Sequence, residues 1–233
     1  MNLSNQDLAK KKAAESAFSK IHNGQKLGIG TGSTVKFLID ALLSTSENLD
    51  ISLAFSSIKS ESLLQHSHYK KLSPSLPTGL DITIDGADYV SNDGILIKGG
   101  GGALTREKIL VSASKKSIII IDESKYITSP KKIKLPVEIL SFGHAETIRK
   151  ISSLEFDGEL RKSSNNQIFI TDNGNYIFDI EITFPNHNIK QIHHDLKNIV
   201  GVVETGVFFG FPYEIWIAFF DEKKAIQIMD FSN

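Results

Sequence analysis

Three short segments of the chain combine residue types that bind anions or move protons. The first is Gly28-Ile29-Gly30-Thr31-Gly32-Ser33-Thr34. Its glycines allow a tight turn, and its hydroxyls and backbone N–H groups would lie at a helix start, where the helix dipole favours an anion. Ser33 replaces the third glycine of a dinucleotide-binding fingerprint, and no Lys-Ser/Thr pair completes a P-loop. The segment predicts a phosphate site; alternatively, Ser33 or Thr34 only caps the helix.

The second segment is Asp85-Gly86-Ala87-Asp88, which follows a predicted strand over 81–84. That strand would deliver both carboxylates to the loop after its carboxyl end, the edge at which open α/β sheets bind ligands. Two carboxylates held close together can share a proton, so one of them could act as an acid or a proton relay. The alternative is a structural Asp-Gly turn.

The third segment runs from Lys98 through Gly99, Gly100, Gly101 and Gly102 to Glu107 and Lys108. Four consecutive glycines cost backbone entropy on folding, and they are needed where a bare backbone approaches a ligand closely. Their N–H groups would form an oxyanion nest opposite Lys98, at the start of a helix that carries Glu107. Leu104 stands where a capping box needs Ser or Thr. The alternative for Glu107 is a solvated surface carboxylate.

Other charged residues give weaker signals. Lys125 follows a predicted strand over 117–121 and would lie at the ligand-binding edge, where it could complete a phosphate site. The run 10–12 is Lys-Lys-Lys, which is typical of a solvated helix face. His193 and His194 are adjacent and have no Asp or Glu at the i+4 spacing of a zinc site, so we expect them at the surface.

Strands alternate with helices in the first half of the chain, which predicts an α/β fold with a doubly wound, mainly parallel sheet. The expected strands cover 26–30, 51–55, 81–84, 94–97 and 117–121, and the expected helices cover 5–21, 35–42, a polar segment ending near 68 and a segment from about 103.

A second, smaller domain is expected after the basic, proline-containing stretch 130–136. Its predicted elements are a strand over 135–140, a helix over 145–153, strands over 168–171 and 176–182, a helix over 189–199 and a strand over 202–208. This order predicts a ferredoxin-like α+β unit. Two further strands, 214–220 and 225–229, are expected to return to the first domain. The predicted catalytic domain is thus 1–131 and 208–233, and the small domain is 132–207.

Composition excludes several classes of protein. Lys and Arg number 26 against 27 Asp and Glu, so no global positive field is available to hold nucleic acid or an anionic membrane. The absence of cysteine excludes disulfides, thiol nucleophiles and Cys-containing zinc sites. The apolar runs are shorter than the roughly 18 residues of a membrane span, and the N-terminus lacks the apolar segment of a secretory signal. We therefore expect a cytoplasmic protein.

The motifs occur together in one order: TGST (31–34), DGAD (85–88), KGGGGALTREK (98–108), ESK (123–125), LPVE (135–138) and TDNGN (171–175). In this order the chain resembles the type A ribose-5-phosphate isomerases over nearly its whole length. The resemblance implies reversible isomerisation of D-ribose 5-phosphate and D-ribulose 5-phosphate by a metal-free enediolate mechanism, in the non-oxidative pentose phosphate pathway. It also implies no cofactor, a homodimer or tetramer, and a small sugar phosphate as the ligand.

The resemblance assigns roles to individual residues. Glu107 would be the base that takes the proton from C2 and returns it to C1, while Lys98 and the glycine N–H groups stabilise the enediolate. Asp85 and Asp88 would bind sugar hydroxyls and help to open the ring or to move protons between O1 and O2. The implied substrate-binding residues are Thr31, Gly32, Ser33, Thr34, Asp85, Gly86, Ala87, Asp88, Lys98, Gly99, Gly100, Gly101, Lys125 and Lys10.

Two features depart from the family pattern: Tyr89 stands where an acidic residue often follows DGAD, and a Phe-rich run covers 208–220.

Two alternative functions share the sheet architecture. A sugar-phosphate sensor would bind without turnover and would need a DNA-reading helix pair, which is not predicted. A sugar-phosphate deaminase or lactonase would not combine DGAD with KGGGGALTREK.

Overall fold

The computed structural model describes residues 3–73, 79–221 and 223–231. The chain divides into two compact units, which are Met1–Ala87, Arg106–Tyr126 and Gly210–Asn233 (unit 1) and Asp88–Thr105 and Ile127–Phe209 (unit 2). The sequence pattern placed residues 88–105 in the larger domain, whereas here they belong to unit 2. The reason is that one strand in this segment pairs with a strand from the end of unit 2, the other strand pairs with the first, and neither joins the large sheet.

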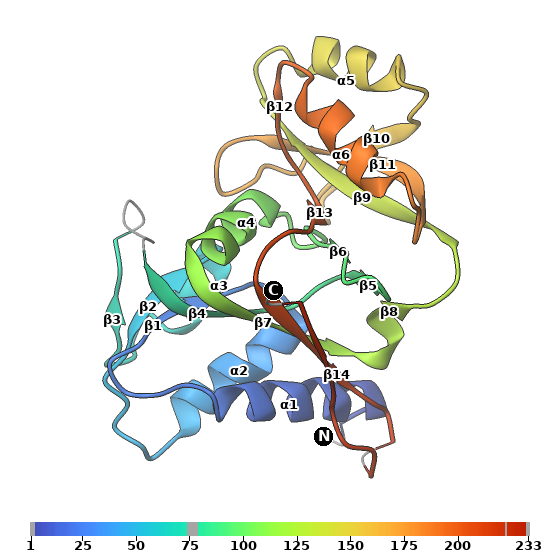
Figure 1. The fold of residues 1–233 in the computed structure, drawn as a ribbon. Helices are drawn as coiled ribbons and strands as arrows, with labels where there is room; N and C mark the ends of the chain where they lie inside the picture. The colour runs from blue at the N-terminus through green and yellow to red at the C-terminus, as the bar shows by residue number, and fades with distance from the viewer. Residues whose placement is uncertain (1–2, 74–78, 222, 232–233) are drawn as a thin grey trace. The chain divides into compact units, whose positions relative to one another are not determined.

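A seven-stranded sheet forms the centre of unit 1 (Figure 1). Its order is β15-β14-β7-β4-β1-β2-β3, and all neighbouring strands run parallel except β14 and β15. The strands are β1 (Lys26–Ile29), β2 (Ser52–Phe55), β3 (Lys70–Lys71), β4 (Leu80–Asp85), β7 (Ser114–Asp122), β14 (Tyr213–Ala218) and β15 (Gln227–Asp230). The mainly parallel sheet and the return of the C-terminal strands to it are confirmed.

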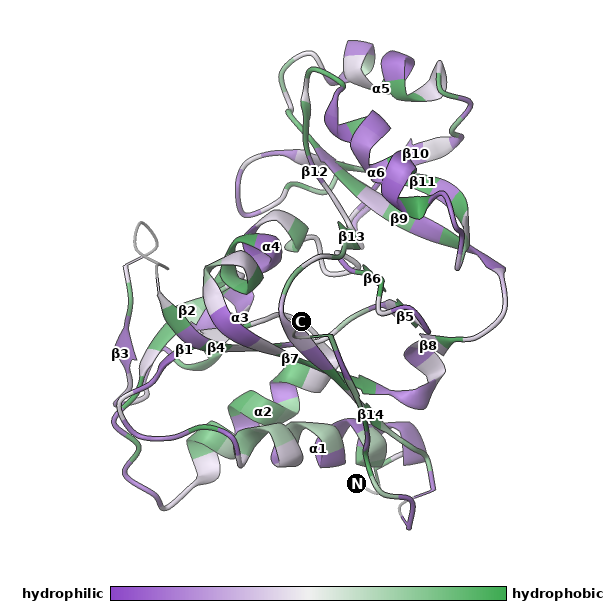
Figure 2. Ribbon diagram, viewed as in Figure 1, coloured by the Kyte–Doolittle hydropathy of each residue, from purple (hydrophilic) through white to green (hydrophobic). Residues whose placement is uncertain are grey.

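Helices cover both faces of this sheet, which makes it doubly wound. They are α1 (Asn5–Phe18), α2 (Ser33–Ser44), α3 (Ile58–Leu63) and α4 (Leu104–Ala113), and a 3-10 turn η1 (Glu123–Lys125) follows β7. Ile82 and Ile84 of β4 belong to a buried hydrophobic core that also contains residues of α1 and α2. In Figure 2 the ribbon of α2 is coloured mostly as hydrophobic. Side chains alternate along a strand, so Thr83 faces the opposite way, toward Leu110 of α4.

Close packing of β1 against β4 explains one glycine of the first motif. A Cβ at Gly28 would lie 2.1 Å from Oγ1 of Thr83, and that hydroxyl lies 2.6 Å from Oγ of Ser114. Gly28 is therefore needed for contact between neighbouring strands, not for the turn that follows β1.

Unit 2 contains a four-stranded antiparallel sheet in the order β10-β11-β9-β12. Its elements run β9 (Lys131–Ile139), α5 (His144–Ser152), β10 (Gly158–Leu160), β11 (Tyr176–Phe184), α6 (Ile189–Lys197) and β12 (Val202–Thr205). This is the strand-helix-strand-strand-helix-strand succession of a ferredoxin-like unit, as predicted. A second small sheet has the order β13-β6-β5-β8, with β5 (Tyr89–Ser91), β6 (Leu96–Ile97), β8 (Tyr126–Ile127) and β13 (Val207–Phe208).

Two strand predictions are corrected. The segment 94–97 was expected among the strands of the parallel sheet, but β6 pairs antiparallel with β5 and β13. The segment 168–171 is not a strand, because only isolated bridges join Ile168 to Lys162 and Ile170 to Tyr176. The strand that pairs with β11 is instead β10, a three-residue segment too short to show a hydrophobic alternation.

Within the described residues, every helix is too short or too polar to cross a membrane.

Tyr69 provides a test of the unit 1 core. Its side chain is 5% exposed, its hydroxyl donates to the carbonyl of Leu42 at 2.8 Å, and burial raises the pKa of the phenol. We expect Tyr69→Phe to lower the free energy of unfolding by about 1 kcal/mol at neutral pH, because the Leu42 carbonyl loses its donor.

The Tyr69 contribution should also depend on pH. Since the folded pKa is raised, the contribution is fully present below the unfolded pKa of about 10 and is lost as the pH rises through the folded pKa. Urea unfolding of wild type and Tyr69→Phe at increasing pH should show the stability gap narrowing above that unfolded pKa. The half-buried Tyr126, changed to Phe, serves as control. A gap that stays constant into the alkaline range would contradict a raised pKa for the Tyr69 phenol.

Candidate functional site

The loop between β1 and α2 presents an uncapped helix start. Gly32 is the N-cap residue of α2, has a φ of 130° and makes no side-chain capping bond. Ser33 is exposed and is the first residue of the helix, whereas Thr34 is buried. The interpretation of Ser33 or Thr34 as a mere cap is therefore wrong. A helix start without a side-chain cap keeps N–H groups available to an anion.

The hydroxyl of Thr31 joins a cluster of serines that sequence reasoning did not identify. It lies 2.8 Å from Oγ of Ser56 and donates to Oγ of Ser57 at 2.8 Å. Ser60 belongs to the same cluster and donates to the carbonyl of Gly30 at 2.7 Å. The available signal was the Ser-Ser pair directly after the predicted strand 51–55, at the carboxyl edge of the sheet.

Asp85 anchors the same loop from the neighbouring strand. It is the last residue of β4, is fully buried, and its Oδ1 accepts from the N–H of Thr31 at 3.1 Å and of Gly86 at 2.7 Å. A Cβ at Gly30 would lie only 1.8 Å from that oxygen. The DGAD segment is therefore more than a turn, because its first carboxylate fixes the backbone of the predicted phosphate loop.

Glu107 lies in the first turn of α4, and its side chain is 4% exposed. The alternative of a solvated surface carboxylate is therefore wrong. Burying a carboxylate is costly, so a buried position is unusual for a helical glutamate and makes Glu107 a candidate for acid–base chemistry.

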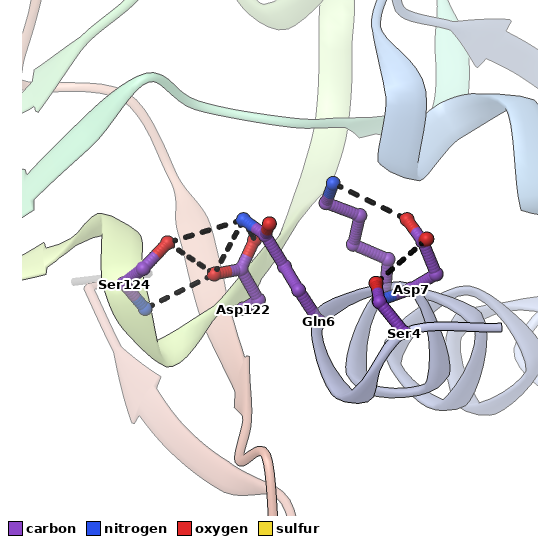
Figure 3. A network of polar contacts seen from close by, with 6 residues as sticks. Ser4, Gln6, Asp7, Asp122 and Ser124 are labelled. Atoms are coloured by element: carbon purple, nitrogen blue, oxygen red, sulfur yellow. Dashed lines mark hydrogen bonds and ion pairs between the residues drawn. The ribbon is translucent and has the colours of Figure 1, made fainter.

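Polar contacts join Gln6 of α1 to Asp122 and Ser124, at the end of β7 (Figure 3). The buried carboxylate of Asp122 accepts from Nε2 of Gln6 at 3.3 Å, and from the N–H of Ser124 at 3.0 Å and its hydroxyl. Lys125 ends η1, one residue after Ser124, and Lys10 lies one turn after Gln6 on α1. The network thus ties together the elements that carry both lysines.

Lys10 already has an acidic neighbour. Its Nζ lies 3.6 Å from Oδ1 of Asp7, and its side chain is 12% exposed. The Ser4 hydroxyl, and to a smaller extent the Lys10 ammonium, lower the pKa of the Asp7 carboxyl. Lys10 is therefore not simply part of a solvated helix face.

In unit 2, Asp88 is joined to the glycine run. Its Oδ2 accepts from the N–H of Gly100 at 2.7 Å, and a Cβ at Gly100 would lie 2.5 Å from its other oxygen. The N–H of Gly102 donates to the carbonyl of Gly99 at 2.9 Å and closes a turn. Two of the N–H groups expected in the oxyanion nest thus already have protein acceptors, and in the described part of the chain the N–H of Gly101 has none.

Lys98 is a fully buried lysine, 1% exposed. Its N–H donates to the carbonyl of Gly206 at 2.8 Å, and its ammonium lies 5.6 Å from the ring centroid of Phe208, within the cation–π range of about 6 Å. A Cβ at Gly206 would lie 2.3 Å from the Lys98 carbonyl oxygen. The first phenylalanine of the Phe-rich run is therefore a partner of the predicted catalytic lysine.

The glycine run is held by side chains that sequence reasoning did not assign. Nη1 of Arg161 donates to the carbonyls of Gly99 at 2.7 Å and Gly100 at 3.1 Å. Phe169 and Pro136 pack where a Cβ on Gly102 or Gly99 would lie. Gly99, Gly100 and Gly102 are thus required by close contacts within the protein.

The motifs LPVE and TDNGN form one buried network in unit 2. Glu138 is fully buried, and its carboxylate accepts from the hydroxyl of Thr105, the first-turn threonine of α4. Its Oε1 accepts from Thr171 at 2.9 Å, Asn173 at 3.1 Å and Asn175 at 2.9 Å. This carboxylate therefore connects the TDNGN turn to the start of α4.

Tyr89, the departure after DGAD, has a structural explanation. It belongs to β5, packs on the unit 2 core, and its ring lies 4.6 Å from the ammonium of Lys131.

The two adjacent histidines differ in exposure. His193 is half-buried, with Nδ1 2.7 Å from Oγ1 of Thr205, whereas His194 is exposed. Within the described residues, no group of three or more His, Asp or Glu side chains is arranged to hold a metal ion.

The structure thus places the predicted residues in two groups. Unit 1 carries Thr31, Gly32, Ser33, Thr34, Asp85, Gly86, Ala87, Glu107, Lys10 and Lys125, and unit 2 carries Asp88, Lys98, Gly99, Gly100 and Gly101.

The chain is similar to known proteins over most of its length. Residues 53–222 match the family described as ribose 5-phosphate isomerase A (phosphoriboisomerase A). The protein named ribose-5-phosphate isomerase A from Bacillus mycoides (strain KBAB4) is 44% identical over 202 residues, which are 85% of this chain and 90% of that protein.

Solved structures show the same similarity. Ribose 5-phosphate isomerase from Plasmodium falciparum gives a TM-score of 0.85 at 32% identity, covering 97% of this chain and 100% of that one. A D-ribose-5-phosphate isomerase in complex with phospho-erythronic acid gives a TM-score of 0.86 at 30% identity, covering 99% of this chain and 100% of that one.

The contact between Gly30 and Asp85 can be tested by stability. Since an alanine Cβ would lie 1.8 Å from Oδ1 and 2.6 Å from Cβ of the buried Asp85, we expect Gly30→Ala to lower the free energy of unfolding by about 1–3 kcal/mol. At Gly86 a Cβ would meet only the Ile120 carbonyl oxygen, at 3.8 Å, so Gly86→Ala is the control. Equal urea midpoints for the two variants would argue against the contact.

Proposed function

We propose a function from one premise: the chain belongs to the ribose 5-phosphate isomerase A family. It is an isomerase, and we assign it the reversible interconversion of D-ribose 5-phosphate and D-ribulose 5-phosphate. The observation that carries the assignment is the burial of Glu107, 4% exposed. A buried carboxylate has no evident use in a protein that only binds a sugar phosphate, whereas aldose–ketose isomerisation needs a base. The resemblance further suggests a homo-oligomer acting in the non-oxidative pentose phosphate pathway.

Glu107 is the proposed base. It takes the proton from C2 of the open-chain aldose, the electron pair of that C–H bond forms the C1–C2 double bond of a cis-enediolate, and the proton returns to C1. A positioned general base contributes about 10²–10⁴-fold. The remainder of the acceleration has to come from groups that stabilise the negative charge of the enediolate.

Lys98 and the glycine run are the proposed source of that stabilisation. The ammonium of Lys98 is fixed by burial and by the Phe208 ring, and the N–H of Gly101 is a fixed donor on a bare backbone. Fixed donors aimed where charge develops need no reorganisation during the reaction. We propose that these groups stabilise the enediolate oxygens without a metal ion, in agreement with the resemblance.

Asp85 and Asp88 are the proposed partners of the sugar hydroxyls. Each carboxylate accepts backbone N–H bonds from a different loop, which keeps its remaining lone pairs in a defined direction. In this proposal they help to open the ring and to move protons between O1 and O2.

The uncapped start of α2 and the lysines of unit 1 are the proposed phosphate site. The N–H groups of residues 32–34 and the exposed Ser33 hydroxyl lie at a helix N-terminus, and Thr31 holds this loop through its bonds to Asp85 and Ser57. Lys125 and Lys10 supply positive charge. Phospho-erythronic acid, which is bound in one solved relative, is a four-carbon acid phosphate and is a suitable probe ligand.

The first test is turnover of ribose 5-phosphate in excess EDTA. We expect wild-type activity to survive EDTA and Glu107→Gln to lose about 10²–10⁴-fold in kcat, since the amide cannot accept the C2 proton. The exposed Glu146→Gln is the matched control and should behave as wild type. A wild type that binds the sugar phosphate without converting it would support the sensor alternative, and release of ammonia from an amino-sugar phosphate would support the deaminase.

The second test concerns the phosphate. We expect Lys125→Ala to raise KM more than it lowers kcat, because a phosphate contact is made equally in the ground state and the transition state. Lys115 is the second residue of β7, the strand that precedes Lys125, and its side chain is 75% exposed. Lys115→Ala should therefore leave both constants unchanged. An unaltered KM in Lys125→Ala would remove this lysine from the proposed site.

A further inference from the structure

We propose that Arg161 is a positioning residue that orients the peptide groups of the glycine run. This inference rests on the proposed isomerase activity and concerns the residues that set the geometry of Asp88 and of the Gly101 N–H group. It is carried by hydrogen bonds within unit 2 alone.

The main chain at Arg161 is fixed on both sides. The residue directly follows β10, its N–H donates to the carbonyl of Ile177 at 2.9 Å, and its carbonyl accepts from Phe169 at 2.8 Å. The guanidinium also lies over the Phe169 ring, 5.9 Å from its centroid. The side chain therefore projects from a rigid backbone along a defined path.

The guanidinium divides its donors between an acid and the glycine run. Nε donates to Oδ2 of Asp179 at 2.8 Å and Nη2 to Oδ1 at 2.5 Å, so this carboxylate occupies one edge of the fork. Nη1 donates to the carbonyls of Gly99 at 2.7 Å and Gly100 at 3.1 Å. The side chains of Arg161 and Asp179 are only 15% and 8% exposed, so water competes little for the bonds between them.

Because the peptide bond is planar, a contact that fixes a carbonyl group also fixes the direction of the N–H group of the next residue. In a trans peptide the C=O and N–H groups point in opposite directions. Because Arg161 holds the Gly99 carbonyl, the N–H of Gly100 is directed away from it, and that N–H donates to Oδ2 of Asp88 at 2.7 Å. By the same reasoning, holding the Gly100 carbonyl turns the N–H of Gly101 away from Arg161.

Glycine makes such an anchor necessary. A run of glycines has no Cβ to restrict its backbone dihedral angles and would otherwise sample many peptide orientations. Arg161 donates to two consecutive carbonyls through one nitrogen, and its bidentate pair with Asp179 prevents the guanidinium group from rotating. A lysine cannot reproduce this arrangement, because its ammonium lacks the planar fork that serves a carboxylate and a second acceptor together.

The test compares Arg161→Lys and Arg161→Ala with the same changes at Arg149. Arg149 makes an equivalent bidentate pair with Glu146, at 2.8 and 2.7 Å, but is exposed and is paired within its own helix. We expect Arg161→Lys to lower kcat by about 10- to 100-fold, since small misplacements of reacting groups have effects of this size. KM for ribose 5-phosphate should change far less than kcat, and the Arg149 variants should match wild type.

Two measurements separate positioning from stability. Guanidinium chloride, at concentrations far below those that unfold the protein, should restore part of the kcat of Arg161→Ala, and sodium chloride at equal ionic strength should not. Amide hydrogen exchange of Gly100, measured by NMR, should be faster in Arg161→Lys than in wild type. This second readout does not depend on turnover, so it holds whether or not the wild type is an isomerase.

The outcomes are distinct. Wild-type kcat in a folded Arg161→Lys protein would overturn the inference, as would a loss of kcat that follows only the unfolded fraction or a Gly100 amide that exchanges as in wild type. If the wild type does not convert ribose 5-phosphate but the Gly100 amide responds to the substitution, the proposed function fails and the positioning contact stands.

Discussion

A buried carboxylate, Asp85, makes the interaction on which the predicted chemistry of unit 1 depends. It is fully buried, and one of its oxygens accepts N–H groups from the loop after β1 and from the loop after its own strand. A carboxylate in this position holds two loops through charge-assisted bonds, which are stronger than bonds between neutral groups. The glycine at position 30 follows as a requirement, because any side chain there would displace the carboxylate.

In unit 2, different residues fix the conformation of the loops. Its glycine run has no side chains of its own, so its peptide orientations come from Arg161 with Asp179, and the start of α4 is tied to the TDNGN turn through Glu138. These charged side chains are largely buried, and each makes at least two hydrogen bonds. Removing one partner would leave a charge with fewer bonds in a low-dielectric interior, which is costly. Such networks therefore define loop geometry closely.

Much of this arrangement could be predicted from the sequence. The strand, glycine turn and helix over 26–44 are local features, and short apolar runs such as 117–121, alternating with helical segments, identified the main strands of the parallel sheet. The serines after β2, and the roles of Arg161 and Glu138, could not be predicted. Arg161 follows a strand of only three residues, which is too short to give a recognisable hydrophobic pattern. Glu138 lies in β9, whose apolar pattern indicates burial but does not indicate the partners of a buried side chain. The expectation that all four glycine N–H groups would face a ligand failed because Asp88 and Gly99 supply protein acceptors for two of them.

The sequence by itself determined where the main strands and glycine turns lie and which residues follow the strand ends, because backbone propensity and hydrophobic periodicity act over a few neighbouring residues. Only the tertiary structure decided that Glu107 is buried, that Lys98 lies against Phe208, and that Asp85 and Arg161 hold loops 54 and 62 positions away. Contacts at that separation depend on strand order and register, which bring distant segments together and have no signature in any single stretch of sequence.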